Sequence, residues 1–309
     1  MRIIQIPSRI NDGFGDGLNW FFSILRQVRA VPPDEAIEMD MTGCNFLNPF
    51  FLLPFMLLVK GEGKERPITI RNDGNNEGFR IYTDLISFGN GLQPENIPGG
   101  NYEALLNEYG GKTYIPIINF PANRNNLDTA IRDNFMNVLN TLLVRQLKLK
   151  GGFHTGVMYL LHEALNNVVD HSKEERGFVF AQYFPSKAFI DICIADAGIG
   201  ILRTYQDRGD EDASTDKEAI SNAAIGKSTK ERPGNESRGY GITTSKAMLV
   251  NGLNGKYFLL SGKAFLIKTI EKEEIIEIPE NLYWKGTIVA LRIPYAGTTE
   301  FNPADYYEN

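Results

Sequence analysis

The apolar run Ala188–Ala195 ends directly at Asp196, and the residues Ala-Gly-Ile-Gly follow it. A short apolar run of this kind predicts a buried β-strand. The carboxylate at its end can accept a hydrogen bond from an exocyclic amine, the group that marks adenine. Gly198 and Gly200 allow the backbone to approach a flat ring closely. The alternative is a plain strand-to-loop turn, in which aspartate and glycine are both common.

Composition narrows the class of protein. The chain has 309 residues, of which 42% are hydrophobic and 23% charged, as in a globular protein of two domains. The net charge is -6 and the sequence has no basic stripe, so we expect no direct nucleic-acid partner. Cys44 and Cys193 lie in apolar runs, which predicts small buried side chains in a reducing compartment and argues against a zinc site.

The N-terminal segment Met1–Pro7 alternates like a strand and has no signal-peptide pattern. The most apolar segment, Phe46–Val59, contains two prolines and is shorter than the roughly 20 residues that span a bilayer. We therefore expect no membrane association and a cytoplasmic location. Within this segment Phe50–Leu58 should form a helix that belongs to the core, with an interface as the alternative.

The first part of the chain alternates strand and helix, which predicts a layered α/β arrangement. The expected strands are Arg2–Pro7, Ala36–Met41 and Pro67–Asn72, and the expected helices are Leu18–Val31, Pro49–Lys60 and Glu77–Phe88. Segment 89–112 is rich in Gly, Asn and Pro and should be an exposed, irregular connection. A last short strand is expected at Tyr114–Phe120, before a boundary near Ala122–Asn126.

The second part should place helices on one face of a mostly antiparallel sheet. Its expected helices are Leu127–Leu149, Thr155–Asp170 and Thr243–Val250, and its first strands are Gly177–Phe184 and Phe189–Ala195, with further strands running to Ile293. The long polar stretch 203–237 predicts either a disordered insertion or a mobile lid over phosphates. The whole chain is thus expected to be of the mixed α/β (α+β) class.

The helix expected over Thr155–Asp170 has two different sides. Its apolar side carries Leu160, Leu161, Ala164, Leu165 and Val168, and its polar side carries Glu163, Asn166, Asn167 and Asp170. The i,i+4 spacing stacks Glu163 beside Asn167. One interpretation of these residues is a solvated polar face. The alternative is a Mg²⁺ site, in which an amide oxygen ligates the ion and the carboxylate acts as a general base.

Glycines also precede the expected helix near Thr243. Free amides at a helix N-terminus, with Gly239 and Gly241 ahead of them, can bind an anion, although a simple glycine-rich loop would look the same. The polar stretch before them adds candidate phosphate contacts, each weakly supported alone. These candidates are Lys227, Ser228, Thr229, Lys230 and Arg232.

Together these segments resemble the motifs of the GHKL ATPase superfamily, which DNA gyrase, heat-shock chaperones, histidine kinases and mismatch-repair proteins share. The resemblance covers about residues 127–295: Glu163–His171 resembles the first motif, Asp196–Gly200 the second, Gly234–Ile242 the lid-and-phosphate motif, and Gly286-Thr287 the last. It implies a two-layer Bergerat-type sandwich over residues 123–309 that binds ATP and Mg²⁺ in an open, lidded pocket.

The resemblance also implies a role for each matching residue. Asn167 would ligate Mg²⁺, Glu163 would be the catalytic base, Asp196 would contact the adenine amine, and Thr287 would support the adenine pocket. The complete expected set of nucleotide-binding residues is Asn167, Asp170, Asp196, Gly198, Gly200, Lys227, Ser228, Arg238, Gly239, Tyr240, Gly241, Ile242 and Thr287.

Within the superfamily, histidine kinases usually lack a carboxylate at the position of Glu163, so the chain looks more like the anti-sigma-factor serine kinases. Residues 1–122 point the same way, because Ile37–Pro49 resembles the strand-to-helix segment of STAS domains, which are partners of those kinases. The phosphorylated serine of that family would fall near Pro49–Phe50, where no hydroxyl exists. This region would therefore be a smaller STAS-like regulatory module, and not the kinase substrate.

Three functions remain open from the sequence. The first is an ATP-controlled switch that acts on a protein partner, such as a sigma-factor-like or STAS protein, with possible phosphoryl transfer. The second is a hydrolysing ATPase that works as a nucleotide-gated homodimer. That function would need a lysine from a following domain, and we expect none after residue 295. The third is a degenerate fold that only scaffolds.

Overall fold

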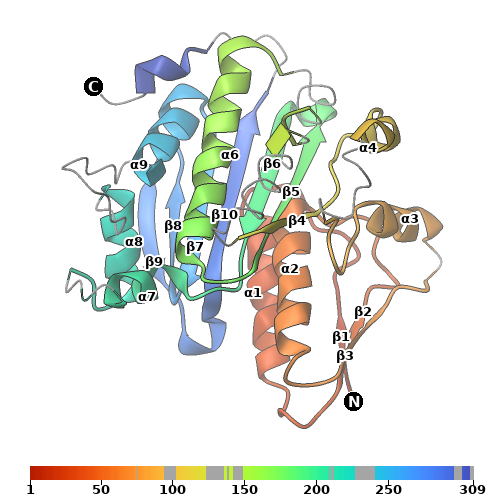
Figure 1. The fold of residues 1–309 in the computed structure, drawn as a ribbon. Coiled ribbons are helices and arrows are strands. Elements are labelled where there is room, and N and C mark those ends of the chain that lie inside the picture. The colour runs from red at the N-terminus through yellow and green to blue at the C-terminus, as the bar shows by residue number, and fades with distance from the viewer. Residues whose placement is uncertain are drawn as a thin grey trace.

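The computed structural model describes residues 1–74, 76–93, 102–122, 136–137, 139–141, 149–207, 209, 212–226, 241–295 and 301–306. These residues form a mixed α/β structure with two sheets, one of three parallel strands and one of seven antiparallel strands (Figure 1). No helix within these residues is long and apolar enough to cross a membrane.

The first sheet has the order β1-β2-β3, with β1 at Arg2–Gln5, β2 at Ile37–Asp40 and β3 at Ile68–Arg71. Helices α1 (Asp16–Arg29) and α2 (Pro49–Glu62) connect these strands. Parallel strands in sequential order need right-handed crossovers, which put both helices on the same face of the sheet. The strand–helix alternation predicted for this part is confirmed within a few residues at each end.

Two further helices, α3 (Glu77–Leu85) and α4 (Tyr102–Tyr109), follow the first sheet. The expectation that all of segment 89–112 is irregular was wrong, because α4 lies inside it. The buried Tyr109 ends this helix, and its hydroxyl donates to the carbonyl of Leu85 in α3. A contact across 24 residues holds the helix, and local composition gave no sign of it.

The second sheet has the order β4-β5-β6-β10-β7-β8-β9, and every adjacent pair is antiparallel. Its strands are β4 (Ile118–Pro121), β5 (Arg176–Phe184), β6 (Phe189–Ala195), β7 (Lys256–Gly262), β8 (Ala264–Lys268), β9 (Glu273–Glu277) and β10 (Trp284–Pro294). The mostly antiparallel sheet that the sequence predicted is therefore present.

The helices of the second part are α6 (Gly151–His171), α7 (Gly200–Gln206), α8 (Asp216–Ala224) and α9 (Gly241–Lys246), with a π-helical turn at Ala247–Gly252 and a 3₁₀ turn at Pro303–Tyr306. Stretch 203–237 is not simply a disordered insertion, since α8 lies within it. A capping box at Thr215 and Glu218 starts this helix, and its buried face includes Ile220. Most of the expected helix Leu127–Leu149 lies outside the described residues.

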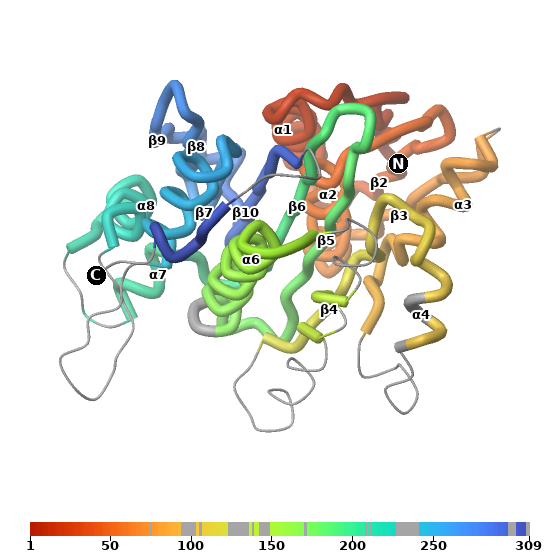
Figure 2. Tube along the Cα trace, turned by 90° about the horizontal axis from the view of Figure 1, so that it is seen from above, coloured from red at the N-terminus to blue at the C-terminus, as the bar shows by residue number. Residues whose placement is uncertain are grey.

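Helices α1 and α2 lie between the two sheets. Figure 2 shows α6 on one face of the second sheet and α1 on the other. Along β6, Ile192 and Ile194 pack in the core beneath α6, whereas Cys193 and Ala195 pack in the core that contains α1 and α2. The expectation of helices on one face is thus incomplete, since the N-terminal helices cover the other face. This double burial explains why β6 is apolar without alternation and why α2 is apolar all round.

The proposed division at residue 122 stays a prediction as a domain boundary. Strand β4 lies on the N-terminal side of it but pairs with β5 in the second sheet. The residues before it also share a core with the second sheet, because α2 contacts β5 and β6. The two parts of the chain therefore share an extensive apolar interface.

Candidate functional site

The carboxyl end of β6 carries the buried Asp196, which is 1% exposed. Its Oδ1 accepts a hydrogen bond from the backbone N–H of Gly198 at 2.8 Å, and its own backbone N–H donates to the carbonyl of Thr287 at 3.0 Å. The pKa of this carboxyl is raised to about 7, mainly because burial disfavours its charged form; the hydrogen bond from Gly198 opposes this shift and the nearby Glu174 adds to it. No cationic side chain in the described part of the chain pairs with it.

The glycines around Asp196 allow backbone to pack on backbone. A Cβ at Gly198 would overlap the carbonyl of Ser172, the residue that caps α6, and a Cβ at Gly286 would overlap the Asp196 carbonyl. Gly200 and Gly286 have φ of +76° and +102°, which favour glycine. These glycines join the Asp196 turn, the end of α6 and the start of β10. Whether they also admit an aromatic ring stays a prediction.

Ser261, at the end of β7, is a site residue that the sequence reasoning missed. Its hydroxyl donates to the carbonyl of Gly286 at 3.0 Å and accepts from the backbone N–H of Ile201 at 2.9 Å. The side chain is 1% exposed and lies beside the turn that leads from Asp196 into α7. A serine inside the largely apolar strand β7 (Lys256–Gly262) was the available signal.

Helix α6 carries the candidate base and metal ligand. The five apolar positions predicted to face the core are all buried, whereas Glu163 and Asn167 are half-buried. A Cβ on Gly241 would overlap the carboxylate of Glu163, so this carboxylate lies against the first residue of α9. Two segments that are far apart in sequence thus meet at Glu163.

The remaining predicted residues divide into two groups. Thr287 is half-buried on β10 directly after Gly286, and Ile242 is half-buried in the first turn of α9. Thr243 Oγ1 donates to the carbonyl of Ala224 at 3.1 Å, which fixes the start of α9 against the end of α8. The side chain of Asp170 lies outside the described residues, as do all of Lys227, Ser228, Thr229, Lys230, Arg232, Arg238, Gly239 and Tyr240.

The described residues of this site offer few ligands for a metal ion. No group of three or more His, Cys, Asp or Glu side chains within the described ranges could hold a metal ion alone. Mg²⁺ keeps several waters and takes phosphate oxygens, so one or two protein oxygens are enough to hold it. Asn167 and Glu163 offer such oxygens one helical turn apart.

Comparison with known proteins adds no assignment, because no protein-family model, curated protein or solved structure matches this chain.

Proposed function

We propose that this protein binds Mg-ATP at the end of β6 and uses nucleotide occupancy to control its action on a protein partner, as in the anti-sigma-factor kinases that the motifs resemble. One observation carries the proposal: segments that lie far apart in sequence, and that hold three motifs and the end of a fourth, contact one another in pairs. Asp196 bonds to Thr287, Gly198 packs on the end of α6, and Glu163 lies against Gly241.

In this proposal each site residue has a separate role. The Asp196 carboxylate accepts a hydrogen bond from the exocyclic amine of adenine, and the adjacent Thr287 supports that edge of the ring. Asn167 provides an oxygen for Mg²⁺, which neutralises phosphate charge when it is bound. Glu163 takes the proton from a partner hydroxyl as that oxygen bonds to the γ-phosphorus and ADP leaves.

The decisive test is calorimetry with Mg-ATP on the intact chain. Asn167→Ala and Asp196→Asn should each weaken binding by about 100-fold, a free-energy loss of about 2.7 kcal/mol. Asn19→Ala removes an exposed helical asparagine from α1, on the opposite face of the sheet, and should bind as the wild type does. If the wild type does not bind Mg-ATP, or if the Asn167 and Asp196 variants bind as well as Asn19→Ala, the proposal is wrong.

The fate of the γ-phosphate separates partner modification from hydrolysis. Incubation of γ-labelled ATP with the protein and STAS or sigma-factor-like candidates should place label on a partner serine, and Glu163→Gln should abolish that transfer. Label that appears only as free phosphate, with a mass that doubles when ATP is added, would instead support a hydrolysing homodimer. A hydrolysing homodimer would not need the STAS-like regulatory role proposed for residues 1–122.

A further inference from the structure

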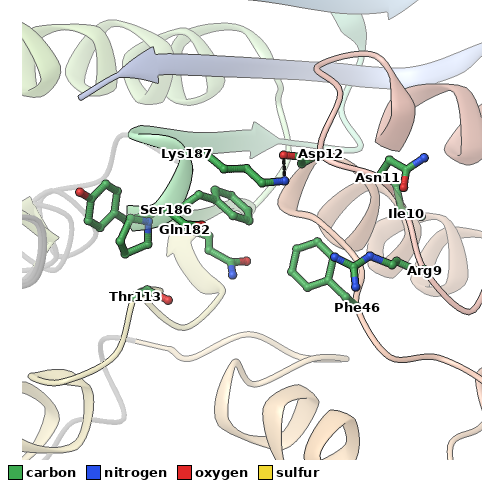
Figure 3. Close-up of a pocket in the computed structure, with 12 residues that line it drawn as sticks. Arg9, Ile10, Asn11, Asp12, Phe46, Thr113, Gln182, Ser186 and Lys187 are labelled. Carbon is green, nitrogen blue, oxygen red and sulfur yellow. Dashed lines mark hydrogen bonds and ion pairs between the residues drawn. The ribbon is translucent and has the colours of Figure 1, made fainter. Parts of the chain in front are cut away.

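A second candidate site lies where loops of the first sheet meet the β5–β6 hairpin of the second sheet. A cavity of about 260 Å³ opens there. Its lining combines Arg9–Asp12, Phe46, Thr113 and the hairpin residues Gln182–Lys187 (Figure 3). Small-molecule pockets usually start near 300 Å³, so this cavity suits a small ligand.

The charge of the cavity is positive and only partly compensated. Lys187 forms an ion pair with Asp12, shown by the dashed line in Figure 3. The guanidinium of Arg9 lies 5.8 Å from the centre of the Phe46 ring. In the described part of the chain no carboxylate pairs with Arg9, so one cation at this cavity is free to bind an anion. Guanidinium groups bind carboxylate and phosphate in a bidentate manner.

The second polar group is the amide of Gln182, which is only 8% exposed. Its Oε1 accepts a hydrogen bond from the hydroxyl of Tyr82 at 3.2 Å. Its Nε2 has no acceptor among the described residues, which leaves two donors unused in a nearly buried amide. This nitrogen is not one of the fully buried atoms left without a partner, so it is reachable from the cavity, where a ligand oxygen can accept a hydrogen bond from it. Figure 3 shows the Gln182 amide extending into the space between Thr113 and Phe46.

The apolar part of the cavity is aromatic. The rings of Phe46 and Phe184 lie edge to face, with their centres 6.1 Å apart. This arrangement offers a flat apolar surface beside the two polar donors. We propose that the cavity binds a small organic anion with a flat apolar group: its carboxylate or phosphate lies between Arg9 and Gln182, and its apolar group packs on Phe46 and Phe184.

This site is separate from the one proposed for the nucleotide. Gln182 pairs across β5 and β6 with Asp191, which is five residues before Asp196 along β6. At about 3.3 Å per residue, the two sites lie roughly 16 Å apart along one strand. An anion bound here would contact both the loops of the first sheet and the hairpin of the second. It would therefore bridge these two parts of the chain.

The test uses three probes in saturation-transfer NMR, without nucleotide, so that its result does not depend on ATP binding. Benzoate and phenyl phosphate carry the two candidate anionic groups, and benzamide is a neutral analogue of similar shape. At least one of the anions should bind, about tenfold more tightly than benzamide. The anion with the higher affinity identifies the headgroup.

The variants assign binding to the cavity. Arg9→Gln and Gln182→Leu should each weaken binding of the preferred anion by about tenfold. Arg26→Gln, which changes an exposed arginine of α1 away from the cavity, should leave it unchanged. Arg9 is exposed, so its variant should keep the wild-type melting temperature. Absence of anion binding, equal binding of benzamide, or full binding by Arg9→Gln would overturn the proposal.

Discussion

Two buried aspartates, Asp191 on strand β6 and Asp196 directly after it, differ in the groups that they bond to. Asp191 is fully buried, and both of its oxygens accept hydrogen bonds from Arg292, at 2.7 and 2.6 Å. Asp196, five residues later, is also buried but its carboxylate accepts from backbone N–H groups. Burial raises the pKa of both carboxyls, to about 6 for Asp191, where Arg292 opposes the shift, and to about 7 for Asp196.

The difference separates a structural carboxylate from a candidate functional one. Arg292 also lies 3.9 Å from the centre of the Phe189 ring and donates to the carbonyl of Asp12, so the Asp191 pair ties the first loop to the second sheet. Asp196 has no such partner among the described residues, and a buried carboxyl with a strongly raised pKa at a glycine-rich turn is typical of a binding site. The following predictions test whether the two aspartates really differ in this way.

The largest expected effect is on stability. Arg292→Met should lower the free energy of unfolding by about 3–5 kcal/mol, because it leaves the Asp191 carboxylate buried without its partner. Urea denaturation followed by circular dichroism measures this loss. The double variant Asp191→Asn/Arg292→Met should recover much of it. A single variant within about 1 kcal/mol of the wild type would mean that the pair is not structural.

At Asp196 we expect a loss of ligand binding without a loss of stability. Asp196→Asn should lose about 100-fold in Mg-ATP affinity, while its free energy of unfolding at pH 7 should equal or exceed that of the wild type, because the neutral amide avoids the cost of a buried carboxylate without a counter-charge. Calorimetry and urea denaturation on the same preparation provide both numbers. Loss of both binding and stability would place Asp196 in the same structural class as Asp191.

The pH dependence sharpens the comparison further. The pKa of Asp196 is raised in the folded state from its ordinary 3.8 to about 7, so the folded protein holds this proton at higher pH than the unfolded chain does. The stability that the proton provides is therefore present below pH 3.8 and lost as pH rises through 7. Relative to Asp196→Asn, the wild type should lose stability between about pH 4 and pH 7, and thermal unfolding across this range measures the difference.

Nucleotide affinity should change in the opposite direction. If adenine needs the ionised carboxylate, Mg-ATP binding should weaken by up to about tenfold for each pH unit below 7. Calorimetry at pH 6 and pH 8 tests this, with benzoate binding at the Arg9 cavity as a control that does not depend on Asp196. Constant ATP affinity over this range would show that Asp196 does not recognise the base as a carboxylate.

The sequence predicted those features of the structure that neighbouring residues determine. The apolar run before Asp196 and the two sides of α6 could be predicted, because a strand or a helix sorts nearby residues by face. The sequence did not predict the contacts between residues that are far apart along the chain. Arg292 is 101 residues from Asp191, and the burial of β6 on its second face depends on α1 and α2. No local pattern reports such pairings, so Ser261 and the Arg9 cavity were also missed.

The smallest expected effect compares two buried serines. Ser261→Ala removes the hydroxyl that bonds to Ile201 and Gly286, and it should lower the free energy of unfolding by about 1 kcal/mol. Ser245 on α9 is 5% exposed, but its hydroxyl has no hydrogen-bond partner among the described residues. Ser245→Ala should therefore be neutral or slightly stabilising.

The same pair tests whether the turn after Asp196 is held in place for a ligand. Without the Ser261 hydroxyl, α7 and β10 lose the group that joins them at Ile201 and Gly286, so Mg-ATP affinity should fall by about threefold to tenfold as well. Ser245→Ala should bind ATP as the wild type does. Equal losses in the two variants, in urea denaturation and in calorimetry, would mean that the Ser261 hydroxyl contributes no more than any buried serine does. The turn would then hold the Asp196 carboxylate in position without the hydrogen bonds of Ser261.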